Sequence, residues 1–326
     1  MSRKISRSLI NGRIGVGTGG QGLKVEWDTA NAGQRQDGDL HWKDVSESSL
    51  EYVTPIWYGD RGVFVGGGAN IMEYVSISST GNTTDFGDLL VSSNSLGACS
   101  NGTRGVTSGN SSNSISYITI ATTGNATDFG DLTKSRSAPG GCSDSTRGFH
   151  GNSTDIDYYT IATTGNASLF GNLVSTHGET SALSNSYRAL WSEDNHTDYI
   201  TTATLGNALD FGDSTVDREG YTSSSTETRG VWIGGRRYSG GWVRYNTIDY
   251  VTIATTGNAT DFGDLLDVRE VGGACANATS RCVVGGGANG VKVNTIEYFS
   301  IDTTGNAADF GDISSTRERV SALSGD

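Results

Sequence analysis

Ile248–Leu265 reads Ile-Asp-Tyr-Val-Thr-Ile-Ala-Thr-Thr-Gly-Asn-Ala-Thr-Asp-Phe-Gly-Asp-Leu, and near copies of this stretch recur along most of the chain. Its Gly-Asn pair recurs at Gly81-Asn82, Gly124-Asn125, Gly165-Asn166, Gly206-Asn207 and Gly305-Asn306. Its aromatic residue recurs at Phe86, Phe129, Phe170, Phe211 and Phe310. Repetition at a period of about 40 residues is typical of propellers, solenoids and other arrays, so it has to be explained before any single motif is interpreted.

A second marker, an arginine followed by a short apolar run, fixes the length of the repeat. It occurs at Arg61, Arg104, Arg147, Arg188, Arg229 and Arg281, with successive spacings of 43, 43, 41, 41 and 52 residues. A weaker copy opens at Arg13, 48 residues before Arg61, with Trp27 in the place of the repeat Tyr and Trp42 in the place of the repeat Phe.

Each repeat contains four predicted strands: one before the arginine, the arginine run, the Ile-Asp-Tyr-Val-Thr-Ile run, and one after Phe-Gly-Asp. In the third strand, Ile248 and Tyr250 point to one side while Val251 and Ile253 point to the other. A strand that is apolar on both faces belongs to a sheet covered on both sides. Four-stranded sheets packed face to face around an axis meet that requirement, because every blade lies between two neighbours.

The two ends of the chain distinguish a closed ring from an open stack. Val320–Asp326 repeats the first-strand motif of Thr180–Asn185 and ends before an arginine. A repeat divided between the chain ends indicates a ring closed by pairing the last strand with the first ones, because open arrays carry polar caps. We therefore predict an all-β propeller of seven four-stranded blades over residues 13–326, preceded by a basic arm at residues 1–12. The alternative is six blades from about Ser46 onward, with the first 45 residues as a separate anchor.

Composition supports this fold and limits the class of partner. Gly is abundant at 47 residues and Pro is nearly absent at 2, which is the balance of many short strands joined by tight turns. The formal net charge of −13 makes binding to nucleic acid or to an anionic membrane unfavourable. No apolar run reaches the length of a signal peptide or a membrane span, so we expect neither secretion nor membrane insertion.

The cysteines are predicted to be buried free thiols. Cys99, Cys142 and Cys275 stand at equivalent places in different repeats, too far apart to form a disulfide, and Cys282 could approach only Cys275. The paired spacing of a disulfide framework or a zinc site is missing.

The repeats resemble those of the kelch family, which carry a hydrophobic run ending in Gly-Gly, then a Tyr, then a Trp. The glycine pairs are Gly19-Gly20, Gly66-Gly67, Gly234-Gly235 and Gly285-Gly286, and the repeat Tyr residues are Tyr74, Tyr117, Tyr158, Tyr199, Tyr250 and Tyr298. The Trp is kept only at Trp42 and is Phe elsewhere, and the repeats opened by Arg104, Arg147 and Arg188 have lost one or both glycines. This resemblance covers about Arg13 to Asp326 and implies a kelch-like β-propeller.

The repeated sequence Thr-Gly-Asn-Ala-Thr-Asp-Phe-Gly-Asp-Leu also looks like the kelch-like repeats of tailed-bacteriophage virion proteins, such as tail-fibre or other surface components. That resemblance implies a structural or host-attachment role and a location in the virion. Two alternatives belong to other classes: a cellular kelch-type protein-interaction module, and a carbohydrate-active or oxidase propeller with a metal or a cluster of acids and arginines at the axis.

No motif in the sequence predicts catalysis. Asp-Phe-Gly begins at Asp85, Asp128, Asp210, Asp261 and Asp309, but repeated copies without the other kinase motifs indicate a turn. Calcium at Asp85 and Asp88 is disfavoured because Leu169 and Asn172 replace both acids in another repeat. His150, His177 and His196 could share a face, yet we expect different blades to keep them apart. We therefore predict no enzyme activity, no cofactor and no metal.

Two segments are predicted to make contacts with partners. The longest loop between second and third strands, Gly234–Asn246, displays large side chains of the kinds that dominate interface energies. These candidate binding residues are Arg236, Arg237, Tyr238, Trp242, Arg244 and Tyr245. The alternative is that Trp242 packs on a neighbouring blade and the arginines only offset the acidic surface. The basic arm, with Arg3, Lys4 and Arg7, is predicted to dock on another virion subunit. A host glycan or protein and a second copy of the chain are further possible partners.

Overall fold

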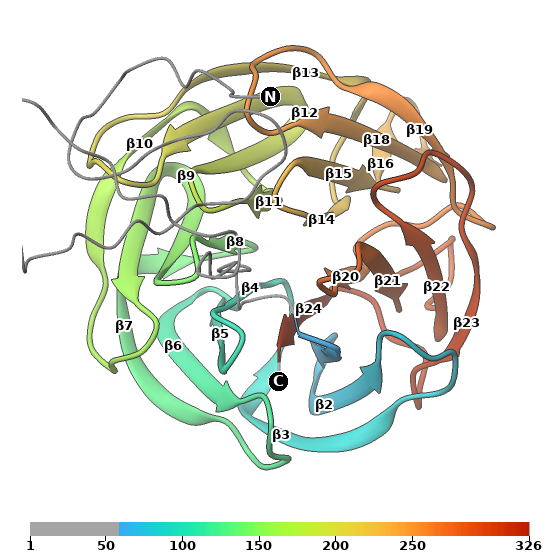
Figure 1. The fold of residues 1–326 in the computed structure, drawn as a ribbon, viewed down its shortest axis with the longest axis horizontal. Coiled ribbons are helices and arrows are strands. Elements are labelled where there is room, and N and C mark those ends of the chain that lie inside the picture. Colours follow the sequence, from blue (N-terminus) through green and yellow to red (C-terminus); the bar gives the residue numbers. More distant parts are fainter. Residues whose placement is uncertain (1–58, 326) are drawn as a thin grey trace, which may run out of the picture. The chain divides into compact units, whose positions relative to one another are not determined.

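The structure, a computed structural model, describes residues 59–325, which form a closed ring of six β-sheets around one axis (Figure 1). Within this range the chain is all-β and contains no helix. From axis to rim, blade 1 consists of β24 (Val320–Gly325), β1 (Arg61–Gly66), β2 (Ala69–Ser76) and β3 (Thr84–Ser93); blade 2 of β4 (Leu96–Ser100), β5 (Arg104–Gly109), β6 (Ser112–Thr119) and β7 (Thr127–Arg136); and blade 3 of β8 (Gly140–Ser143), β9 (Arg147–Thr160) and β10 (Ser168–His177).

Blade 4 consists of β11 (Ser181–Ser184), β12 (Arg188–Thr201) and β13 (Leu209–Arg218); blade 5 of β14 (Thr222–Ser225), β15 (Arg229–Ile233), β18 (Thr247–Thr252) and β19 (Thr260–Asp264); and blade 6 of β20 (Gly273–Ala276), β21 (Arg281–Gly285), β22 (Thr295–Ser300) and β23 (Ala308–Asp312). In blade 3 the first half of β9 pairs with β8 and its second half with β10, so β9 fills the places of two strands. β12 does the same in blade 4.

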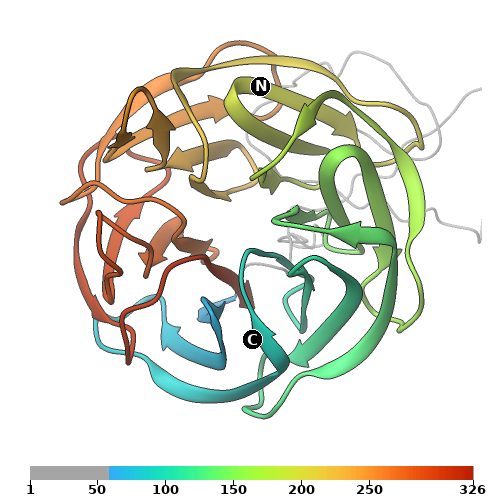
Figure 2. The ribbon, with the colours of Figure 1, turned by 180° about the vertical axis from the view of Figure 1, so that it is seen from behind.

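The ring closes between the last strand and the first arginine run, as the split repeat predicted. β24 pairs antiparallel with β1, with Leu323 opposite Val63, and supplies the axial strand of blade 1 (Figure 2). Blade 6 also contacts blade 1 directly, because the Gly81 N–H donates to the Phe310 carbonyl at 2.9 Å. A seventh blade has no place between them. The predicted count of seven is therefore wrong, and the alternative count of six is confirmed.

Several sequence predictions concern residues outside the described range. The described residues, 59–325, all belong to one compact unit. The predicted domain boundary at residue 13, the basic arm with Arg3, Lys4 and Arg7, and the proposed anchor all lie outside the described residues.

The repeat arginine joins each blade to the next one. In blade 1, Arg61 lies 4.6 Å from the centre of the Tyr74 ring and donates to the Ile120 carbonyl of blade 2 at 2.8 Å. Equivalent arginine-to-carbonyl bonds occur at each of the remaining five boundaries. The last of them closes the ring, because Arg281 of blade 6 donates to the Ser78 carbonyl of blade 1. The marker that fixed the repeat length is thus an inter-blade bond.

The Gly-Asn turn forms a second inter-blade contact, at the rim. At the boundary of blades 1 and 2, the Gly124 N–H donates to the Phe86 carbonyl at 2.7 Å, and the Asn125 side chain accepts from the Asp88 N–H at 3.0 Å. The same contacts recur at all six boundaries. The Asn side chain therefore bonds the adjacent blade and not its own turn.

The core lies between the blades. Phe86 is buried among Val65 and Met72 of its own blade and Ile118 and Ile120 of blade 2, so it fills the gap between the two blades. Each repeat Phe also meets the edge of the repeat Tyr of its own blade. All four cysteines are buried and free, as predicted, and burial raises the pKa of the Cys99 and Cys282 thiols to about 12.

Candidate functional site

The Gly234–Asn246 loop folds into a hairpin beside blade 5. β16 (Arg236–Tyr238) pairs antiparallel with β17 (Trp242–Arg244), which sets Tyr238 opposite Trp242. Gly234 permits the exit from β15, because its φ is +65° and a Cβ there would lie 2.2 Å from the Arg269 carbonyl oxygen. We refer to residues 236–244 as the rim hairpin.

Arg236 holds the rim hairpin to three inter-blade connections. Its guanidinium lies 3.0 Å from Glu179, 3.2 Å from Glu219 and 3.1 Å from Glu270. Although burial lowers it, the charges of Glu179 and Glu270 raise the pKa of Arg236 above its usual value. The guanidinium also lies 4.3 Å from the centre of the Trp242 ring. Arg236, predicted to bind a partner, is therefore engaged within the protein.

The other predicted binding residues fall into two groups. Arg244 pairs with Glu270 at 2.8 Å, Arg237 pairs with Asp217, and Tyr245 is partly buried at the base of the loop. Tyr238 and Trp242 instead face solvent, with 65% and 47% of their surfaces exposed. Their rings lie 5.3 Å apart at 72°, edge to face. Trp242 packs on Arg236 and Tyr238 of its own hairpin, so the alternative, in which it packs on a neighbouring blade, is not what the structure shows.

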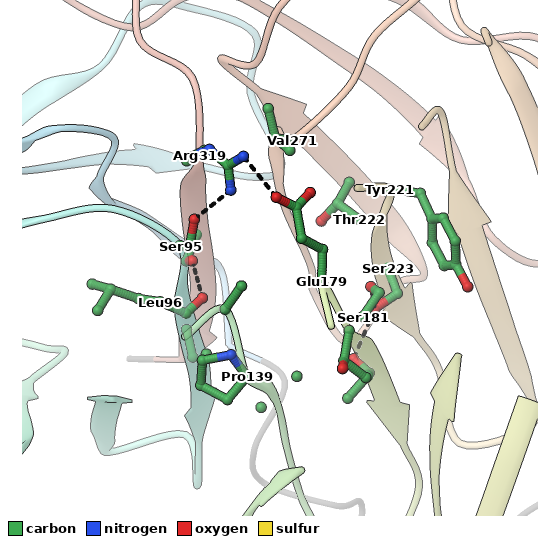
Figure 3. A pocket seen from close by; sticks show the side chains of 18 of the residues that line it. Ser95, Leu96, Pro139, Glu179, Ser181, Tyr221, Thr222, Ser223, Val271 and Arg319 are labelled. Atoms are coloured by element: carbon green, nitrogen blue, oxygen red, sulfur yellow. Dashed lines mark hydrogen bonds and ion pairs between the residues drawn. The ribbon is translucent and has the colours of Figure 1, made fainter. Parts of the chain in front are cut away.

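A cavity of about 120 Å³ lies on the axis, on the side where the chain passes from one blade to the next. Arg319 stands at its mouth, where it reaches Ser95 at 2.8 Å and Glu179 at 2.6 Å (Figure 3). Pro139 and Tyr221 line the wall. Arg236 binds the other oxygen of Glu179, so one chain of ion pairs connects the axis to the rim hairpin.

Residues at the cavity mouth adopt an uncommon backbone conformation. Ser95, Ala138, Val271 and Arg319 all have φ between +48° and +58°, a region that β-branched residues such as valine rarely enter. Ser95 donates its N–H to Arg319, and Arg319 donates its N–H to Val271. These bonds tie successive inter-blade connections into a collar around the axis.

Serine hydroxyls form a ring at the other end of the axis. Each donates to a backbone carbonyl of the preceding blade at 2.5 to 2.7 Å. The donors are Ser100, Ser143, Ser184, Ser225 and Ser324. Blade 6 has Ala276 at this position, so the ring lacks one bond.

Buried pairs of a basic residue and a carboxylate cross five of the blade boundaries, and sequence reasoning missed them. The basic residue stands seven residues after the repeat Phe of one blade, and the acid directly precedes the repeat Tyr of the next blade. The pairs are Arg136–Asp157, His177–Asp198, Arg218–Asp249, Arg269–Glu297 and Arg317–Glu73. Between blades 1 and 2 both positions are serine, Ser93 and Ser116. The two positions therefore change together from repeat to repeat, and this pattern in the sequence could have predicted that they are in contact.

The histidines are arranged differently from the prediction. His177 and His196 come from different blades, yet both approach Asp198, each through its Nε2 at 3.1 Å, so the expectation that blades keep them apart is wrong for this pair. Burial raises the pKa of Asp198, but hydrogen bonds from His177 and the Val174 N–H outweigh it and lower that pKa below its usual value. His150 is separate and fully buried, and burial lowers its pKa to about 3.

Over residues 59–325, no group of three or more His, Cys, Asp or Glu side chains is arranged to hold a metal ion. The described part of the chain also has no helix that is long and apolar enough to cross a lipid bilayer. No protein-family model and no curated protein matches the chain.

Proposed function

We propose that this protein is a non-enzymatic structural component of a bacteriophage virion, at the tail or capsid surface, whose kelch-like propeller presents its rim for host attachment or subunit contacts. The proposed location in the virion rests on the resemblance of the repeat sequence to phage virion proteins. The β-propeller itself supports a structural or protein-interaction role.

One observation carries the non-enzymatic part of the proposal: the repeated polar residues are used to hold the blades together. The repeat arginines, the Gly-Asn turns and the buried pairs of a basic residue and a carboxylate all cross blade boundaries. The longest loops between second and third strands lie instead in blades 5 and 6, where the rim hairpin and the 286–294 loop approach each other at Arg244 and Gly290. A rigid scaffold that displays variable loops on one side is the usual arrangement of a binding protein.

The enzyme alternative expects acids and arginines at the axis, and Glu179 and Arg319 do lie there. Glu179 shares its oxygens between Arg319 and Arg236, and Arg319 also binds Ser95. A general acid or base has to offer a proton site to a substrate, whereas these groups already bind each other. Their arrangement therefore favours a structural role for the collar.

Particle composition tests the proposed location. Virions would be purified by density gradient from lysates of cells that produce this chain, and their proteins would be identified by mass spectrometry and located by immunogold labelling. We expect the chain at a constant ratio to the major capsid protein and at the particle surface. Recovery of the chain only in the soluble fraction, in complex with a cellular protein, would favour the cellular kelch-type module instead.

A deletion tests the proposed docking role of the basic arm. Removal of residues 1–10 takes away Arg3, Lys4 and Arg7, and we expect a folded propeller that no longer enters particles. A full-length variant with these three residues changed to Gln is the matched control for charge. Normal incorporation of the deletion variant would contradict the docking role.

A further inference from the structure

We propose that Trp242 and Tyr238 on the rim hairpin form a binding site for a neutral saccharide ring. This inference rests on the proposed display function and names the ligand class of that surface. It starts from the cross-strand pair itself, whose two rings meet edge to face and are both exposed.

The aromatic pair is fixed before any ligand arrives. Arg236 lies under the Trp242 ring at 4.3 Å, and three carboxylates hold that guanidinium in place. Tyr238 holds the ring from the side. Because Trp242 is ordered in advance, a ligand that stacks on its open face does not have to order the side chain on binding.

A pyranose ring suits such a surface chemically. One side of the ring carries C–H groups with partial positive charge, which are attracted to the negative face of an aromatic ring. Its edge carries hydroxyls, which need polar partners. Arg236 and Arg244 pair across the same face of the hairpin as the aromatic pair, and Ser239 lies in the adjoining turn, so polar groups are close by.

The size and charge of the surface disfavour other ligands that contact aromatic rings. Tyr238 and Trp242 offer about 200 to 300 Å² of exposed aromatic surface, well below the roughly 800 Å² per partner of a stable protein interface. Nucleic acid bases also stack on aromatic rings, but the net charge of −13 repels the phosphates that accompany them.

Saturation-transfer NMR on the full chain tests the proposal, with a panel of neutral oligosaccharides (maltohexaose, cellohexaose, mannohexaose and N-acetylchitohexaose) as probes. We expect at least one to bind, and Trp242→Ala and Tyr238→Ala each to weaken its binding by about tenfold, near the upper end of an aromatic contact. Trp242→Phe, which keeps a stacking ring, should retain most of the affinity. Tyr187→Ala is the matched control, because Tyr187 is 61% exposed in a different blade.

Three results would overturn the saccharide assignment: no binding of any probe at millimolar concentration, binding that Trp242→Ala leaves unchanged, or Trp242-dependent binding of a proline-rich peptide or single-stranded DNA in place of saccharide. None of these results affects the outcome of the particle-composition experiment. The chain could still be found in virions, so failure of this inference is distinguishable from failure of the proposed function.

Discussion

The Arg218 guanidinium lies 2.8 Å from the Asp249 carboxylate across the boundary between blades 4 and 5, and both side chains are completely buried. Burial lowers the pKa of Arg218, and the charge of Asp249 opposes that shift. Removing one member of a buried ion pair leaves an uncompensated charge, which costs about 3–5 kcal/mol. We therefore expect Asp249→Ser to lower the free energy of unfolding by about that amount, as measured by urea denaturation.

The boundary between blades 1 and 2 suggests a compensating variant, because Ser93 and Ser116 occupy the two positions of the ion pair there. The double variant Arg218→Ser with Asp249→Ser removes both charges together. We expect it to be more stable than Asp249→Ser alone, since no lone charge stays buried. Strictly additive losses would show that the two side chains act independently.

The rim contacts between blades depend on a close approach that only glycine allows. A Cβ on Gly130, whose φ is +145°, would lie 2.5 Å from the Gly165 carbonyl oxygen of the next blade. Gly130→Ala should therefore cost about 1–3 kcal/mol through strain and displacement of the turn. Gly124→Ala is the matched control, because nothing lies within 4 Å of its Cβ position. Equal melting temperatures of the two variants would contradict this account.

The sequence was sufficient to predict the ring because the fold depends on residues that repeat. Arg61 and its equivalents, the Gly-Asn turns and the repeat Phe residues each make one inter-blade contact per blade, so their spacing is the spacing of blades. The blade count was wrong because the Arg13 copy shares the motif of an arginine run. Which run pairs with the last strand depends on β24 meeting Arg61–Gly66 in space, and a local motif does not encode that choice.

The site was predictable in position but not in role. Large exposed side chains in an irregular loop identified the rim hairpin, and Tyr238 and Trp242 are indeed exposed. Arg236 is held within the protein by ion pairs with Glu179, Glu219 and Glu270, which come from three different inter-blade connections. Ion pairs between residues this distant in sequence appear only when the ring has closed.

His150 gives stability a pH dependence that can be separated from that of the carboxylates. Its hydrogen-bonding partners are neutral: Ser108 at Nδ1, and Tyr159 and Cys99 near Nε2. Burial, followed by the charge of Arg136, lowers its pKa from 6.5 to about 3. Between these values the unfolded chain binds more protons than the folded one, so stability falls as the pH falls.

This linkage predicts a loss of about 2 kcal/mol between pH 7.5 and pH 5, a range in which most carboxylates remain ionised. Urea denaturation at the two pH values would measure it. His150→Gln should lack this contribution, while His196→Gln, at a partly exposed position, should retain it. Parallel pH profiles of the wild type and His150→Gln would mean that His150 is not held neutral by burial.

The serine ring at the axis lacks one hydroxyl, and a single substitution should supply it. Ser324 donates to the Ala276 carbonyl at 2.7 Å, and Ser225 donates to the Ser184 carbonyl, but blade 6 has no hydroxyl to donate to Ser225. Ala276→Ser places an Oγ at the position that its five counterparts occupy. One added hydrogen bond contributes about 0.5–1.5 kcal/mol, which should raise the melting temperature by about 1–2 °C for a protein of this size. Ser225→Ala, which deletes one existing bond of the same ring, should lower it by a similar amount. A lower melting temperature for Ala276→Ser would show that blade 6 has alanine there because the hydroxyl does not fit.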